Sequence, residues 1–290
     1  MKFLVLFLKI SYPTWLLKLI DTLSKEIFIM EEKEQFIGLL FLSSYNSRQN
    51  MSDYWSKNDL LECKPFVECM GRNRFIYIKS MLHCCNNESL GANKMAKVTP
   101  LYDIVNESLQ LFGILHDNLS IDESMVPYFG RHSCKQFIRG KPIRFRYKLW
   151  VLCSFTGMPY RVSLYEGKNL NQTNEPLGYR VVKQLISNCK SGNHHLFFDN
   201  FFTFADLIKE LGDIGFAATG TIRQNRLKGC PTVPVDTMKK KDRGAFERLL
   251  AGNTEMVRWN DNNVVPFCSN AAGVEPVSRN CKMLDKGQTC

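Results

Sequence analysis

The stretches Leu119-Ser120-Ile121-Asp122-Glu123 and Leu196-Phe197-Phe198-Asp199-Asn200 decide the fold of this chain. Each is an apolar run of strand length that contains or ends in an aspartate. A carboxylate in such a run is unfavourable unless it is paired or holds a metal ion. Ligands of open sheets gather at the carboxyl ends of neighbouring strands, so Asp122 and Asp199 are candidates for a shared divalent cation. The alternative for Asp199 is that it caps a helix expected over residues 202–211.

The segments around these two strands predict an α+β fold, a mixed sheet with helices against its faces. Residues 1 to about 116 have mainly helical spacing, and beyond residue 223 the pattern weakens into expected loops at 228–231 and 239–241. Helical spacing predicts helices over residues 31–42, 74–82, 101–112, 177–189 and 204–211. Strands are expected over residues 118–124, 147–155, 160–165, 195–198 and 215–222, with a small hairpin formed by 255–259 and 264–268.

The basic charge of the chain is concentrated in its second part. The 290 residues carry a net charge of +10, and residues 124–161 contain eight Lys or Arg and no acidic residue. A surplus confined to one segment is typical of a polyanion partner, nucleic acid before membrane, and a solvated basic face is the alternative. The candidate DNA-binding residues alternate with aromatic side chains, which suits phosphate contacts beside stacking surfaces. They are Arg131, Lys135, Arg139, Lys141, Arg144, Arg146 and Lys148.

Composition excludes several classes of protein. The 11 cysteines are odd in number and contain no C-x-x-C pair, which indicates reduced intracellular thiols rather than a disulfide framework. No run of 18 apolar residues occurs, so we expect no membrane-spanning helix. The chain has no P-loop, no G-x-G-x-x-G fingerprint and no Ser/His/Asp signature, so we expect no nucleotide cofactor.

The residues around the two aspartates resemble a known family, the piggyBac transposases and piggyBac transposable element-derived proteins. The resemblance covers roughly residues 30–277, with collinear motifs at family-like spacing. Its first catalytic motif corresponds to Leu119–Arg131. The other matching stretches are 53–56, 72–75, 97–101, 141–143, 148–151, 165–168, 198–203, 218–223 and 259–262.

The resemblance implies an RNase H-like catalytic fold with three metal-binding aspartates, preceded by a helical dimerisation and DNA-binding domain. Such enzymes use Mg²⁺ to cut transposon ends and join them at TTAA sites. Asp122 matches the first catalytic aspartate and Asp199 the second. The implied domains are a partial helical domain (1–116), the RNase H-like core (117–223), a β-rich insertion domain (224–277) and an irregular tail (278–290). The implied partners are DNA and a second copy in a homodimer, and the implied location is the nucleus, with the cytoplasm as alternative.

The chain departs from the family at its third aspartate. The family carries that residue in a Gly-Gly-Val-Asp context after the insertion domain, and this motif does not occur here. Asp261 and Asp285 are the nearest substitutes, in the hairpin and the tail. The cysteine-rich C-terminal module is also missing, so we expect a truncated, catalytically incompetent, DNA-associated protein. The alternatives are an active Mg²⁺-dependent transposase or nuclease completed by a missing segment or partner, and a non-enzymatic interaction protein or relic.

Overall fold

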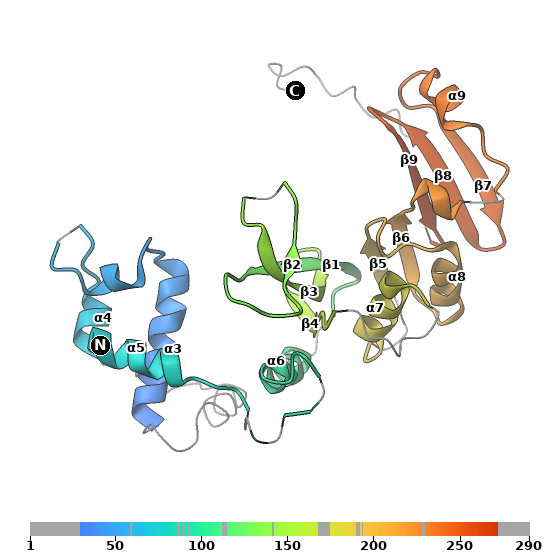
Figure 1. Cartoon of the computed structure of the whole chain (residues 1–290). Helices are drawn as coiled ribbons and strands as arrows, with labels where there is room; N and C mark the ends of the chain where they lie inside the picture. The colour runs from blue at the N-terminus through green and yellow to red at the C-terminus, as the bar shows by residue number, and fades with distance from the viewer. Residues whose placement is uncertain are drawn as a thin grey trace. The chain divides into compact units, whose positions relative to one another are not determined.

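The chain divides into two compact units in a computed structural model (Figure 1). The first unit takes in residues 1–113, 127–147 and 164–168, and the second takes in residues 114–126, 148–163 and 169–290. The described residues are 30–58, 60–85, 88, 90–91, 93–111, 115–140, 142–167, 175–189, 192, 194–227 and 230–271.

The first unit is built mainly from helices. They are α3 (Met30–Tyr45), the 3₁₀ turn η1 (Met51–Trp55), α4 (Lys64–Cys69), α5 (Arg72–Met81) and α6 (Thr99–Leu111). A proline in the first turn of α4 favours its start, because that position needs no amide donor. The Trp55 indole donates a 2.7 Å hydrogen bond to the Met70 carbonyl, which joins η1 to the end of α4. The buried core residues are Phe36, Ile37, Leu39, Tyr54, Cys63, Phe66, Met70, Phe75 and Ile78.

A mixed sheet runs through the chain, and its strands in the described residues follow the order β2-β3-β1-β5-β6-β9-β8-β7, with β4 paired to β3. The bounds are β1 (Asn118–Pro127), β2 (Gln136–Phe137), β3 (Phe145–Ser154), β4 (Pro159–Leu164), β5 (His195–Phe198), β6 (Ala217–Thr221), β7 (Phe246–Ala251), β8 (Thr254–Asn260) and β9 (Val264–Ser269). The β3–β4 turn contains Gly157 at φ 87°, a left-handed conformation that glycine adopts without strain.

The centre of the sheet is parallel and is covered by helices on one face. β1 pairs with β5, and β5 with β6, in parallel. The helices α7 (Leu177–Ile186) and α8 (Ala205–Asp213) lie beside these strands and are joined by a 2.8 Å ion pair between Lys183 and Glu210 (Figure 1). Alternate strand residues are fully buried, including Leu119 and Leu196, whereas Phe197 on the other face is 38% exposed. This alternation is the pattern of a sheet packed on one side.

The last three strands continue the same sheet. β9 runs antiparallel to β6, and β8 and β7 follow by antiparallel pairing. The fully buried Arg258 guanidinium donates to the Thr232 hydroxyl (2.8 Å) and the Val233 carbonyl, and it lies 3.8 Å from the Glu247 carboxylate. These contacts fasten the segment before α9 (Val235–Lys239) to β8.

The observed elements agree with most of the expected ones, and the exceptions are short or strongly charged. The expected hairpin at 255–268 is observed, but it has a third strand, β7, that the sequence pattern did not predict. The expected loop over 239–241 overlaps the end of α9, and the strand expected to end at Ser124 continues to Pro127. Within the described residues, no helix is long and apolar enough to cross a membrane.

Candidate metal and nucleic-acid site

Strand register places the two predicted aspartates side by side. The parallel β1–β5 pairing ends with Ile121 opposite Phe198, so the next residues are Asp122, which is still in β1, and Asp199, which directly follows β5. Neighbouring strands lie about 4.8 Å apart, which is close enough for two carboxylates in one row to share a cation. Both side chains are exposed. We call this pair the aspartate edge.

Asp122 extends from an unbroken strand. One oxygen of its carboxylate accepts a 2.7 Å hydrogen bond from the Glu123 amide. On the neighbouring strand β3, burial raises the pKa of the Cys153 thiol, and the Asp122 charge raises it further. The charge of Asp122 therefore lies close to β3 as well as to β5.

Asp199 is placed by a tight turn after β5. Its Oδ1 atom accepts the Phe201 amide at 2.8 Å, and its backbone carbonyl accepts the Thr203 hydroxyl, also at 2.8 Å. Helix α8 begins only at Ala205, with Phe204 as its N-cap and no side-chain capping bond. Asp199 therefore does not cap α8, and the alternative to metal binding considered for it fails.

Three cations of the second unit contact residues that are next to the two aspartates in the chain or in the same turn. Lys148 lies 3.3 Å from the Glu123 carboxylate and 4.6 Å from the centroid of the Trp150 ring. Arg223 donates to the Asn200 side-chain oxygen at 3.1 Å. Arg226, in the 3₁₀ turn η3 (Gln224–Arg226), donates to backbone carbonyls of the turn that follows Asp199.

The donor set fits one hard cation better than two. Carboxylate oxygens are the ligands that Mg²⁺ prefers, and Mg²⁺ is often held by one or two carboxylates while it keeps several waters. The described residues contain no group of three or more His, Cys, Asp or Glu side chains placed to hold a metal. Asp261 lies in the turn between β8 and β9, where its carboxylate is paired with Arg243 at 2.6 Å. Asp285 lies outside the described residues.

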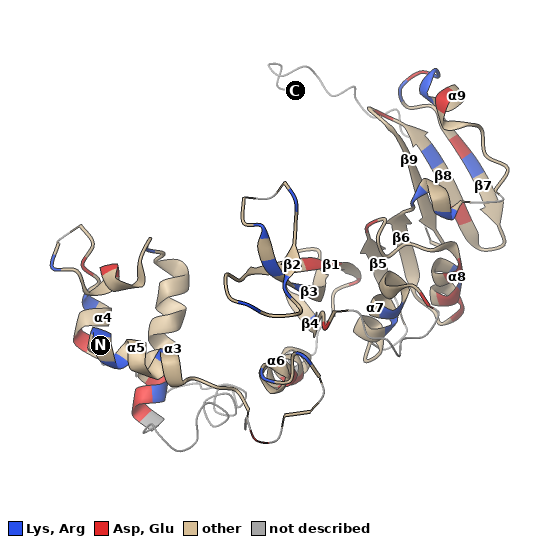
Figure 2. Cartoon of the chain, in the orientation of Figure 1, with Lys and Arg blue, Asp and Glu red and all other residues tan. Residues whose placement is uncertain are grey.

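The predicted basic residues lie mainly in the first unit. Six of the seven fall between residues 127 and 147, a segment that we call the basic arm, and Figure 2 shows its Lys and Arg around β2 and β3. Lys148 belongs instead to the second unit, and Lys141 lies outside the described residues. The exposed cations are Arg131, Arg139 and Arg144.

The remaining described cations of the arm are partly engaged with its own backbone. Lys135 donates to the Gly130 carbonyl at 2.7 Å, and Arg146 donates to the Ile143 carbonyl at 2.9 Å. Phe129, Phe137 and Phe145 are 81%, 59% and 41% exposed, and the Lys135 ammonium lies 4.4 Å from the centroid of the Phe145 ring.

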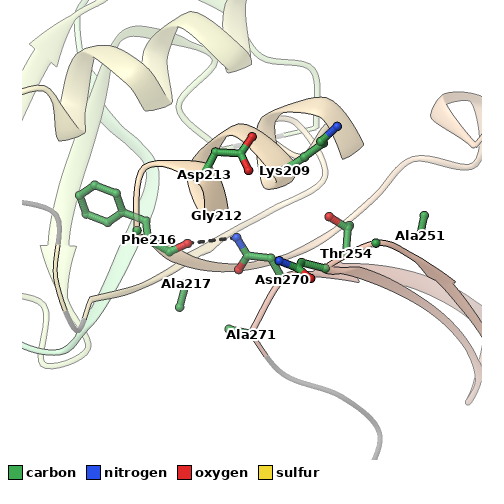
Figure 3. Close-up of a pocket in the computed structure, with 12 residues that line it drawn as sticks. Lys209, Gly212, Asp213, Phe216, Ala217, Ala251, Thr254, Asn270 and Ala271 are labelled. Atoms are coloured by element: carbon green, nitrogen blue, oxygen red, sulfur yellow. Dashed lines mark hydrogen bonds between the residues drawn. The ribbon is translucent and has the colours of Figure 1, made fainter.

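A pocket lies in the second unit (Figure 3). Its lining includes Lys209, Asp213 and Asn270, together with Phe216 and Ala217 at the start of β6. The aspartates follow the opposite, carboxyl ends of the parallel strands. The pocket is therefore separate from the candidate metal site.

The chain combines a mixed sheet and helices with two aspartates that directly follow the paired residues of neighbouring parallel strands, and with a segment rich in Lys and Arg. Residues 24–289 match the family described as Transposase IS4, and the chain belongs to that family.

Two curated human proteins are similar to the chain. It is 38% identical over 261 residues to PiggyBac transposable element-derived protein 3 from Homo sapiens, covering 87% of this chain and 44% of that protein. It is 35% identical over 257 residues to PiggyBac transposable element-derived protein 2 from Homo sapiens, covering 85% and 43%. The chain thus spans less than half the length of these relatives.

A solved structure confirms the fold. The cryo-EM structure of a piggyBac transposase synaptic complex with hairpin DNA matches with a TM-score of 0.73 at 21% identity, over 87% of this chain and 54% of that one. The expected α+β fold and the family resemblance are both confirmed.

Sequence reasoning missed Arg226 as part of the site. The residue follows a matched motif that ends at Arg223, and nothing in its local pattern distinguishes it from a solvated arginine. Its contacts with residues about 25 positions earlier are visible only in the folded chain.

Proposed function

We propose that this chain is a DNA-associated protein that contacts phosphates through the basic arm and does not carry out strand transfer by itself. The observation that carries the proposal is the basic arm, where exposed Arg131, Arg139 and Arg144 alternate with exposed phenylalanines. Guanidinium groups bind phosphates in a sequence-independent manner, and aromatic rings offer stacking surfaces.

The expected loss of catalysis rests on the number of metal anchors. In-line phosphoryl transfer with two metals needs both ions held against the attacking and leaving oxygens. Asp122 and Asp199 supply two carboxylates, and the sequence has no Gly-Gly-Val-Asp motif to supply the third. A misplacement of about 1 Å in such a site lowers the rate by about 10²-fold. Bound Mg²⁺ would therefore help to orient a DNA phosphate at this edge without completing the reaction.

The test is a salt titration of DNA binding by fluorescence anisotropy. Each phosphate contact contributes about −0.9 to the slope of log K against log salt concentration. The triple variant Arg131→Ala/Arg139→Ala/Arg144→Ala should therefore reduce the slope by about 2.7 and weaken binding to unrelated sequences equally. The matched control is Lys239→Ala/Lys240→Ala/Lys241→Ala, which removes the same charge from exposed positions around the end of α9.

The two triple variants distinguish the basic arm from general charge. A slope that falls in the arginine variant and stays within experimental error of wild type in the lysine control supports the proposal. Equal slopes in the two variants, or no DNA binding by wild type at 50 mM salt, would contradict it.

A Mg²⁺-dependent nuclease or transposase is the second candidate, favoured by the side-by-side position of Asp122 and Asp199. Nicking of supercoiled DNA by the purified chain, lost in both Asp122→Ala and Asp199→Ala, would establish this activity and overturn the expected incompetence. Nicking that persists in both variants would indicate a contaminating nuclease.

Location and assembly follow from the proposed DNA association. We expect the tagged full chain to accumulate in the nucleus rather than the cytoplasm, and to form a homodimer in light scattering after size exclusion. A non-enzymatic interaction protein or relic predicts no DNA binding, so the salt titration separates it from the leading proposal.

A further inference from the structure

The Arg226 side chain binds the turn that directly follows Asp199. Its guanidinium group donates to the carbonyl oxygens of Asn200 (2.8 Å), Phe201 (3.2 Å) and Thr203 (2.5 Å). The carbon at the centre of the guanidinium lies 3.7 Å from the centroid of the Phe204 ring. One side chain thus contacts four of the five residues that follow Asp199.

Two glycines show how closely this turn is packed. A Cβ atom on Gly178 of α7 would lie 2.5 Å from the Phe201 carbonyl oxygen. A Cβ atom on Gly220 of β6 would lie 2.3 Å from the Thr203 hydroxyl oxygen. The turn is therefore held between the backbones of α7 and β6, and the Arg226 side chain adds hydrogen bonds to three of its backbone carbonyl groups.

The positive charge of Arg226 does not explain why an arginine would favour a metal site at Asp199. Burial lowers the pKa of Arg226, the Arg223 charge lowers it further, and the Asp199 charge raises it. An arginine nevertheless stays protonated in proteins. A positive charge beside a metal-binding carboxylate should weaken cation binding. The contacts with carbonyl groups, rather than the charge, are therefore the feature that would favour a metal site.

We propose that Arg226 is a positioning residue, which holds the Asn200–Thr203 turn so that the Asp199 carboxylate stays in the row of Asp122. The proposal rests on the proposed function, in which these two aspartates bind one divalent cation. Arginine suits the task because its planar fork offers five donors in fixed directions and stacks on an aromatic ring, whereas lysine offers a single ammonium group.

The experiment is a Mn²⁺ titration of the full chain by electron paramagnetic resonance. Loss of a residue that orients a metal ligand typically weakens metal binding about 10- to 100-fold, and we expect a change in this range for Arg226→Ala. Arg226→Lys keeps the charge without the fork, so its affinity should lie closer to that of the alanine variant. Arg248→Ala is the matched control, because it removes a half-exposed, ion-paired arginine from β7 at the end of the sheet.

The outcomes separate this proposal from the one on which it rests. Wild type that binds no Mn²⁺, or binds it unchanged in Asp199→Asn, would refute the metal pair and this role with it. Wild-type binding lost in Asp199→Asn but kept or strengthened in Arg226→Ala would refute the positioning role alone. Full recovery in Arg226→Lys would assign the effect to charge and also refute it.

A general loss of structure is distinguished by a second readout. Near-ultraviolet circular dichroism and the thermal midpoint are measured on the same samples at the temperature of the titration. If Arg226→Ala unfolds, Arg226→Gln, which keeps one amide donor group, replaces it. Native spectra with weakened Mn²⁺ binding support the positioning role, and native spectra with unchanged binding overturn it.

Discussion

Replacing Gly178 by alanine should destabilise the second unit, although alanine is the better helix former. In a helix interior, alanine is favoured over glycine by about 1 kcal/mol, but Gly178 is only the second residue of α7, so the gain from helix propensity is smaller there. Here the new Cβ atom would lie 2.5 Å from the Phe201 carbonyl oxygen and 3.1 Å from the Phe202 Cα atom. Both are backbone atoms, so relief requires α7 or the turn after Asp199 to move. Overpacking of this kind typically costs about 1–3 kcal/mol.

The assay is urea unfolding followed by circular dichroism, with thermal unfolding as a second measure. We expect a net loss of about 1–2 kcal/mol, which lowers the melting midpoint by about 2–8 °C in a unit of this size. Gly192→Ala is the control, because a Cβ atom there would meet nothing within 4 Å. Gly192→Ala should leave the free energy of unfolding unchanged or raise it by up to about 1 kcal/mol, because alanine reduces the conformational entropy of the unfolded chain. A Gly178→Ala protein as stable as wild type would refute the packing argument.

Three further predictions concern the second unit. Arg258→Ala should cost about 3–5 kcal/mol in urea unfolding, because it leaves the half-buried Glu247 carboxylate without its fully buried partner; a loss under 1 kcal/mol would contradict this. Hydrogen bonds from Lys183 and then Tyr179 lower the pKa of Glu210 in the folded protein below its ordinary value of 4.5. The ionised Glu210 therefore stabilises the fold above pH 4.5, and this stabilisation is lost as the pH falls through the lower pKa of the folded state. Glu210→Gln should therefore reduce the loss of unfolding free energy at acidic pH by at most about 1 kcal/mol, because the Lys183 and Glu210 side chains are exposed. An unchanged dependence of stability on acidic pH would count against the Lys183–Glu210 ion pair. Burial raises the pKa of the buried Cys268 thiol to about 11, so a brief iodoacetamide pulse at pH 8 should label the exposed Cys230 and spare Cys268, as peptide mapping would show.

The sequence predicted the central strands because their apolar runs are short and uninterrupted. The strand over residues 195–198 was predicted with its observed bounds, and the register then placed Asp122 beside Asp199, as the apolar runs had indicated. β7 was missed because Phe246-Glu247-Arg248-Leu249-Leu250-Ala251 mixes charged and apolar residues without strict alternation. As the last strand of the sheet, it is stabilised by pairing with β8 rather than by a buried face.

Contacts between distant residues account for what the sequence did not predict. The antiparallel pairing of β9 with β6 joins residues about 50 positions apart, and no local pattern specifies it. The role of Arg226 could not be predicted for the same reason. Its partners are backbone carbonyl groups, which every residue possesses, so no sequence motif marks them. The roles assigned to Asp122, Asp199 and the basic residues, and the domain boundaries expected at 116, 223 and 277, remain predictions.

The position of β9 also matters for anyone who shortens this chain. Its strand covers the side of β6 that would otherwise expose unpaired amide and carbonyl groups along Thr219–Thr221. An exposed strand of that kind is a template for pairing with other molecules, so a fragment that ends before β9 should aggregate unless another segment covers it. The β8–β9 hairpin thus protects an edge of the parallel strands as well as extending the sheet.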